Sequence, residues 1–134
     1  MMRLILSLPC FLALVCWTAP LPAEEIEHTT DTLEVVKKNV DEGEAVLLDV
    51  RTQPEWDKGH IAGALHVPLD QISQGKGLDK IPKDKVIYTF CEVGKRSLTA
   101  GRLLAKEKFI VRVLKPGYQD LLRAGFQKGE SKEK

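Results

Sequence analysis

Cysteine is scarce in this chain, and the scarcity excludes several kinds of protein. Three cysteines occur in 134 residues, and two of them, Cys10 and Cys16, lie in an apolar N-terminal stretch. Without that stretch a single thiol, Cys91, remains, so an internal disulfide is excluded. The cysteines and the three histidines show no spacing that suits zinc, and we expect no metal site.

The chain also has no excess of charge of either sign. It contains 20 lysines and arginines and 19 aspartates and glutamates, and removal of Arg3 with the N-terminal stretch leaves nineteen of each. A balanced domain of this kind gives no indication of a nucleic-acid partner. The Lys/Glu-rich residues 129–134 predict a solvated, disordered tail.

A long apolar run is present at the N-terminus alone, and it falls short of the roughly 20 residues of a membrane span. A short basic start precedes the apolar residues 4–17, and the small residue Ala23 stands before the first acidic pair. This layout predicts a cleavable signal peptide over residues 1–23 and a periplasmic or secreted protein with no stable membrane anchor. A retained anchor is the alternative. Lipid attachment is disfavoured because neither Cys10 nor Cys16 follows a small residue.

The remaining residues are enough for one domain with a modest core. Residues 24–40 are predicted to form a polar lead and a first helix, with Thr30 or Asp31 as its N-cap and Gly43 beyond its end. Residues 41–128 then form the main domain. No internal repeat or linker divides it.

Two short apolar runs, residues 45–50 and 85–90, predict strands that are buried on both faces, as in a parallel sheet. Shorter strands are expected near residues 65–67 and 110–114. Helical segments are expected between them, at residues 53–56, 69–73, 98–106 and 118–124. This alternation predicts an α/β domain with a mostly parallel sheet.

The segment "CEVGKRS", residues 91–97, follows the second buried strand directly and precedes a helix. The carboxyl ends of parallel strands line the ligand crevice of such folds. If the loop curls, with Gly94 at a positive φ, its N–H groups converge on the sulfur of Cys91. The helix start and the cations Lys95 and Arg96 then favour the thiolate.

These residues also have interpretations that imply no function. A free cysteine is often a small buried hydrophobic residue, and Lys95 and Arg96 could simply be solvated. The position of Cys91 at a strand end argues against the first. The second is disfavoured because the helix dipole opposes cations at an N-terminus, which points to a functional role for Arg96 above all.

At this point the sequence resembles the single-domain rhodanese family of sulfurtransferases. The resemblance rests on "LLDVRTQPEWDKGHIAGALHVPL" (residues 47–69), on the Cys-x-x-Gly-x-Arg-Ser pattern of residues 91–97, and on "VLKPGYQDLLRAGF" (residues 113–126). It implies a five-stranded parallel sheet flanked by helices on both faces. It also implies that Cys91 carries a persulfide, and that the loop residues Glu92, Val93 and Gly94, together with Arg96 and Lys95, bind the sulfur donor.

The resemblance implies sulfur transfer from a donor such as thiosulfate or a persulfide to cyanide, a thiol or a protein acceptor, with no cofactor. Two other functions stay open: a phosphatase or arsenate reductase of the related fold, and a sulfur-delivering module that binds a partner protein. Four residues separate Cys91 from Arg96, a tighter loop than a bound phosphate needs. Glu92 beside the sulfur would oppose an anionic donor if it turned inward.

The histidines and one acid–base pair complete the set of candidates. A Cys–His hydrolase needs a histidine within hydrogen-bond reach of the thiol, and neither His60, in a turn, nor His66, in a strand expected to pack away from Cys91, fits that role. His28 lies in the polar lead with no assigned role. Asp49 and Arg51 are predicted to form a structural pair that fixes the turn after the first strand, rather than to line the pocket.

Overall fold

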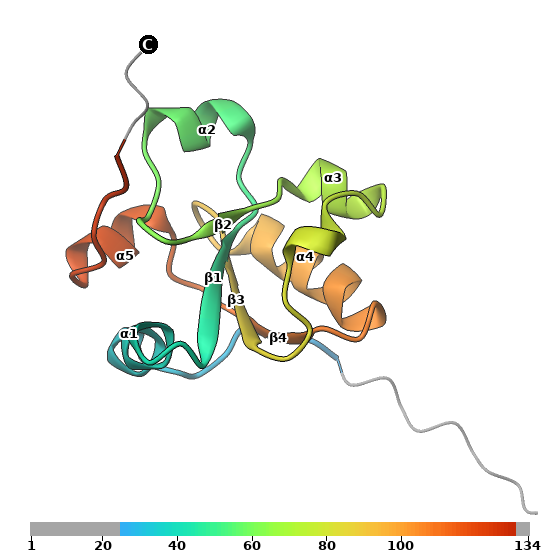
Figure 1. The fold of residues 1–134 in the computed structure, drawn as a ribbon, viewed down its shortest axis with the longest axis horizontal. Helices are drawn as coiled ribbons and strands as arrows, with labels where there is room; N and C mark the ends of the chain where they lie inside the picture. The colour runs from blue at the N-terminus through green and yellow to red at the C-terminus, as the bar shows by residue number, and fades with distance from the viewer. Residues whose placement is uncertain (1–24, 131–134) are drawn as a thin grey trace, which may run out of the picture.

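The computed structural model describes residues 25–130, which form a four-stranded sheet with the strand order β2-β1-β3-β4 (Figure 1). Every neighbouring pair of strands is parallel. The strands are β1 (Ala45–Asp49), β2 (Leu65–His66), β3 (Val86–Phe90) and β4 (Ile110–Val113). The α-helices are α1 (Leu33–Asp41), α2 (Gln53–Lys58), α3 (Leu69–Ser73), α4 (Lys95–Lys106) and α5 (Tyr118–Arg123).

Helices cover both faces of this sheet, as predicted (Figure 1). On one face, α1 and α5 pack against side chains such as Leu47 and Phe90. On the other face, α3 and α4 pack against side chains such as Leu48 and Ile87. Successive residues of β1 and β3 therefore pack into the cores on opposite faces of the sheet. This explains why both strands are unbroken apolar runs in the sequence. The α/β prediction is confirmed.

The predicted fifth strand is reduced to a single bridge. His28 pairs with Val113 at the outer edge of β4, and the N–H of Thr29 donates to the Val113 carbonyl at 2.7 Å. Thr30 is already exposed and outside the pairing, so the polar lead does not extend the bridge into a strand. The sheet thus has four strands and one bridging residue where five strands were expected.

Local predictions fail where tertiary partners compete. The N-cap of α1 is Thr32, not Thr30 or Asp31, and its side chain accepts from the N–H of Val35. Asp31 accepts hydrogen bonds from Tyr88 at 2.6 Å and from Arg112 at 2.7 Å instead. These hydrogen bonds, that from Tyr88 first, hold the pKa of Asp31 below its ordinary value.

One further boundary differs from the predictions. Helix α4 begins at Lys95, ahead of the predicted start at residue 98, so the two loop cations belong to its first turn. The connection between α3 and β3 contains a 3₁₀ turn, Leu78–Lys80.

No helix within residues 25–130 is long and apolar enough to cross a membrane. The predicted signal peptide and residues 131–134 of the predicted tail lie outside the described residues. At the start of that tail, the N–H of Gly129 donates to the His60 carbonyl at 2.8 Å. The proposed domain boundaries stay predictions.

Candidate active site

Cys91 is the first residue after β3, and α4 begins four residues later at Lys95. Strand β3 pairs with β1 on one side and with β4 on the other, so the loop of residues 91–94 lies at the middle of the sheet's carboxyl edge. This edge is where α/β proteins place their ligands.

Gly94 gives the loop its curl. Its φ is +85°, which confirms the predicted positive value, and it forms the N-cap of α4. Its N–H donates to Cys91 Sγ at 3.1 Å. A Cβ at this position would lie 3.0 Å from the Lys115 carbonyl oxygen and 3.1 Å from Nε2 of His28, so both conformation and space favour glycine.

Ser97 also belongs to the site, although it was not among the residues predicted from the sequence. The Cys91 thiol donates to Ser97 Oγ at 3.6 Å, and the Ser97 hydroxyl lies 3.3 Å from the Leu114 carbonyl, so rotation of the hydroxyl turns its hydrogen to the sulfur when the thiol is deprotonated. Ser97 is fully buried in the first turn of α4. The available signal was its place as the last residue of the Cys-x-x-Gly-x-Arg-Ser pattern.

The thiol of Cys91 is acidic although it has 0% exposed surface. Burial by itself raises the pKa of this thiol. Hydrogen bonds from the N–H and the hydroxyl of Ser97, and from the N–H groups of Val93 and Gly94, outweigh burial and bring the pKa below its ordinary value. The loop therefore favours the thiolate, in the predicted direction.

Gly117 packs directly against the backbone of the loop. A Cβ on Gly117 would lie 1.8 Å from the carbonyl oxygen of Glu92, so no other residue fits without displacing the loop. The next residue, Tyr118, donates its N–H to the carbonyl of Cys91 at 2.9 Å. The Pro116-Gly117 turn thus fixes the position of the Cys91 backbone relative to the start of α5.

Arg96 forms a bidentate ion pair with Glu55 at the start of α2. Its two terminal nitrogens donate to the two carboxylate oxygens at 2.7 and 2.8 Å. The same carboxylate accepts from the N–H and the hydroxyl of Thr52, at 2.9 and 2.7 Å, in the capping box of α2. These contacts, the Arg96 hydrogen bonds above all, hold the pKa of Glu55 far below its ordinary value.

Arg51 lies on the other side of the loop and confirms the predicted structural pair. Its N–H donates to Asp49 Oδ1 at 2.9 Å, and its buried guanidinium donates to the same carboxylate at 2.8 and 3.0 Å. The remaining nitrogen, Nη1, is 3.5 Å from Glu92 Oε2, and the guanidinium carbon is 4.1 Å from the centre of the Tyr118 ring. Glu92 therefore turns toward a cation.

The other predicted site residues lie on the outside of the loop. Val93 is 72% exposed at its tip, and Lys95 is exposed in the first turn of α4. Their predicted contacts with a donor, and that of Arg96, stay predictions.

The histidines take structural positions. Nε2 of His28 lies 2.9 Å from the Gly94 carbonyl, which gives this residue a place at the loop that the sequence did not indicate. The rings of His60 and His66 stack on Trp56, with centroids 3.9 and 4.6 Å away. Within residues 25–130 no hydrogen bond joins a histidine to Sγ, and no group of three or more His, Cys, Asp or Glu side chains could hold a metal ion.

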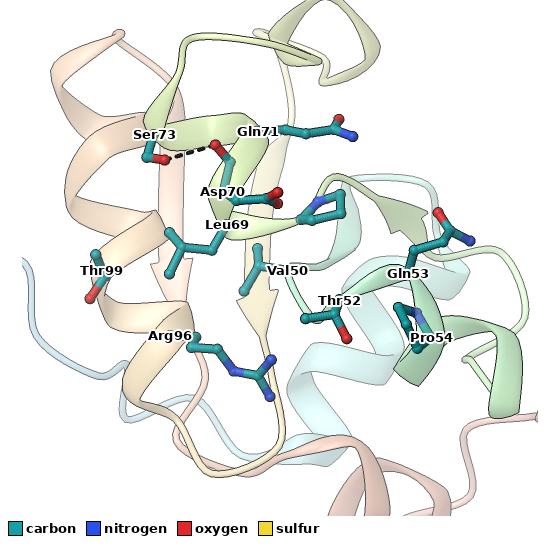
Figure 2. A pocket seen from close by; sticks show the side chains of 11 residues that line it. Val50, Thr52, Gln53, Pro54, Leu69, Asp70, Gln71, Ser73, Arg96 and Thr99 are labelled. Atoms are coloured by element: carbon teal, nitrogen blue, oxygen red, sulfur yellow. Dashed lines mark hydrogen bonds between the residues drawn. The ribbon is translucent and has the colours of Figure 1, made fainter.

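A cleft of about 730 Å³ opens beside Arg96, between the start of α2, α3 and the start of α4. Figure 2 shows the Arg96 side chain extending from α4 toward Thr52 at the start of α2. The floor is largely apolar and includes Val50, Pro54 and Leu69. The residues that line the cleft include Arg96 but not Cys91.

Fold and site together define an α/β protein whose reactive group is one cysteine thiol, surrounded by main-chain N–H groups at the end of a central strand. The family model described as the rhodanese-like domain matches residues 32–124, more than half of the chain. The chain belongs to this family.

Curated relatives include a putative sulfur carrier protein, YrkF of Bacillus subtilis, 36% identical over 92 residues that cover 66% of this chain and 48% of that protein. The thiosulfate sulfurtransferase GlpE of Coxiella burnetii is 29% identical, over 64% of this chain and 74% of that protein. The human single-domain sulfurtransferase TSTD1 has a similar structure, with a TM-score of 0.61, 26% identity, and coverage of 72% of this chain and 97% of that one. The chain spans about half or less of the length of the first curated relatives it matches.

Proposed function

We propose that the protein is a sulfurtransferase that carries sulfur as a persulfide on Cys91. The observation that carries the proposal is the amide contact to the thiol, with Gly94 N 3.1 Å from Sγ and the Ser97 hydroxyl on the same sulfur. Hydrogen-bond donors that are already in place stabilise negative charge on sulfur without reorganisation. The same donors serve a persulfide, whose charge lies one atom further out.

The chemistry is a double displacement without net oxidation. The Cys91 thiolate attacks the outer sulfur of a donor such as thiosulfate, a new S–S bond forms, and sulfite leaves with the electron pair of the broken bond. An acceptor nucleophile, cyanide or a thiolate, then attacks the outer sulfur of the persulfide. Thiocyanate or a new persulfide leaves, and the Cys91 thiolate returns.

Two observations favour a protein as one natural acceptor. Val93 is 72% exposed in the loop, two residues after the reactive cysteine, and offers an apolar contact point there. One relative is named a putative sulfur carrier protein. Sulfur delivery to a docked partner is therefore the second candidate function, and it uses the same persulfide.

Intact-mass measurement tests the proposal directly. The protein is incubated with thiosulfate and, separately, with a small organic persulfide, and each sample is examined for the addition of one sulfur atom. Cys91→Ser is the control, with circular dichroism to verify its fold. Formation of thiocyanate from cyanide measures the second half of the cycle. A wild type that gains no sulfur from either donor rejects the proposal.

The phosphatase alternative receives its own assay. The four residues between Cys91 and Arg96 leave a tight loop. Arg96, the residue that would bind a phosphate group, is already paired with Glu55. Hydrolysis of an aryl phosphate or reduction of arsenate above the Cys91→Ser background would support that alternative instead.

We also propose that the protein is exported, on the basis of the leader-like pattern in residues 1–23. Expression of the full chain, followed by mass measurement of the product in the periplasm or medium, tests this. A new N-terminus at Glu24 supports export, and retention of Met1 in the cytoplasm contradicts it.

A further inference from the structure

The rim of the Cys91 loop carries carboxylates that occupy its guanidinium groups. Arg96 is paired with Glu55 at 2.7 Å. Arg51 is paired with Asp49 at 2.8 Å and reaches Glu92 at 3.5 Å. A small dianion that approaches the sulfur thus meets arginines that are already paired with carboxylates.

Glu55 is held firmly in its blocking position. One of its oxygens accepts from Thr52 N–H, from the Thr52 hydroxyl and from Arg96, and the other oxygen accepts from Arg96 alone. Such charge-assisted, bidentate contacts are the strongest hydrogen bonds available to these groups. An incoming anion has to compete with this carboxylate for the two terminal nitrogens of Arg96.

Arg51 offers no substitute. Its side chain is 3% exposed, and Nη2 also donates to the Gly59 carbonyl at 2.8 Å. The remaining nitrogen, Nη1, lies 3.5 Å from the carboxylate of Glu92, which is 39% exposed. The cations that the sequence places near the sulfur are therefore largely neutralised in the folded protein.

We propose that Glu55 is a specificity-determining residue that occupies Arg96 and directs the site toward persulfide donors and away from compact dianions such as thiosulfate. This inference rests on the proposed function. A persulfide presents a terminal sulfur with a single charge, which the loop N–H groups receive without a guanidinium. A thiosulfate ion presents a second charge on its sulfonate, for which the rim offers only arginines that are already paired with carboxylates.

The preferred step balances without a further reagent. The Cys91 thiolate attacks the terminal sulfur of the persulfide R–S–S⁻, and the Sγ–S bond forms as the S–S bond of the donor breaks. The electron pair of the broken bond leaves with the thiolate R–S⁻. One sulfur atom has moved, and the total charge is unchanged.

The decisive comparison is Glu55→Gln against Asp57→Asn. Glutamine retains the capping box of α2 because its side-chain oxygen also accepts at this position. Asp57 is an exposed carboxylate of the same helix that accepts from Gln53 at 2.8 Å, so its variant removes the same charge away from Arg96. The two donors are thiosulfate and the persulfide of N-acetylcysteamine, whose charge lies on its sulfur alone.

We expect Glu55→Gln to raise kcat/KM for thiosulfate by roughly tenfold, chiefly through a lower KM, because Arg96 regains charged hydrogen bonds for the donor. The value for the persulfide should change by less than about threefold, because its recognition uses main-chain N–H groups. Asp57→Asn should leave the ratio of the two values unchanged. Added salt should shrink the gain, since exposed charges are screened.

Glu92→Gln is an independent test, because Glu92 caps no helix. We expect it to raise kcat/KM for thiosulfate by a smaller factor than Glu55→Gln does. A ratio that stays at the wild-type value in both glutamine variants, or a higher thiosulfate KM in Glu55→Gln, overturns the inference and leaves the sulfurtransferase proposal standing. Failure of the wild type to take sulfur from either donor overturns both.

Discussion

The inner wall of the Cys91 loop and its outer rim are held by different forces. The inner wall, formed by Gly94, Ser97 and Gly117, is buried or tightly packed and contacts the cysteine through main-chain groups and one hydroxyl. The rim, formed by Arg51, Glu55, Glu92 and Arg96, consists of charged side chains, three of them about one third exposed.

The difference separates two properties of the site. The inner wall sets the acidity of the thiol, and its geometry is inseparable from the packing of the fold. The rim sets the charge that a donor meets, and half-exposed ion pairs contribute only about 0–1 kcal/mol to folding. Apart from Arg51, which is buried and paired with Asp49, rim residues can therefore be exchanged at little cost in stability, whereas wall residues cannot. The following predictions test this contrast.

Gly117→Ala should have the largest effect. The new methyl group would meet the Glu92 carbonyl oxygen at 1.8 Å, and backbone cannot yield as a flexible side chain does. We expect a loss of about 3 kcal/mol in the free energy of unfolding, measured by urea denaturation. Gly63→Ala is the control, because Gly63 has a φ of +77° and open space around its Cβ position, so it should lose only about 1 kcal/mol. Equal losses would show that the wall is not tightly packed.

Arg96→Ala should reduce kcat/KM for thiosulfate by roughly tenfold while the fold persists, because the variant removes a cation and leaves the Glu55 carboxylate unpaired near the sulfur. Steady-state kinetics and a thermal melt are the measurements. Arg102→Ala, an exposed arginine of the same helix, is the matched control. Unfolding under mild conditions would identify Arg96 as a structural residue.

Ser97→Ala should move the pH dependence of the thiol. The hydroxyl stabilises the charged form, so its removal raises the pKa of Cys91, and thiolate formation should shift to higher pH. Ultraviolet absorbance of the thiolate during a pH titration measures this shift. Persulfide formation near neutral pH should fall accordingly. Thr99→Ala, which removes a hydroxyl bonded to the Lys95 carbonyl, should leave the titration unchanged.

His28→Ala should have the smallest effect. It removes the side chain 2.9 Å from the Gly94 carbonyl, a contact that is partly buried, and should cost about 1 kcal/mol in unfolding free energy. His28→Gln, whose amide can donate, should restore part of the loss, whereas Glu27→Ala next to it should change nothing. The absence of any difference between His28→Ala and Glu27→Ala would remove His28 from the support of the loop.

Much of the fold was predictable from the sequence because its strands are unbroken apolar runs and its turns carry glycine. The positive φ of Gly94, the pairing of Asp49 with Arg51 and the direction of the Cys91 pKa follow from short-range patterns. Long-range partners were not predictable in the same way. The contact of Glu55 with Arg96 spans 41 residues, and that of His28 with Gly94 spans 66. The capping box explains why a glutamate stands at position 55, but it does not indicate that this glutamate pairs with Arg96.

The complete burial of Cys91 bears on its survival. An acidic thiol is also the thiol that peroxides oxidise most readily, first to sulfenic acid and then irreversibly to higher acids. Because Cys91 has no exposed surface and no second cysteine lies within residues 25–130, the folded loop shields the sulfur from direct contact with bulk oxidants. The burial therefore protects an unpaired, reactive sulfur from irreversible damage between turnovers.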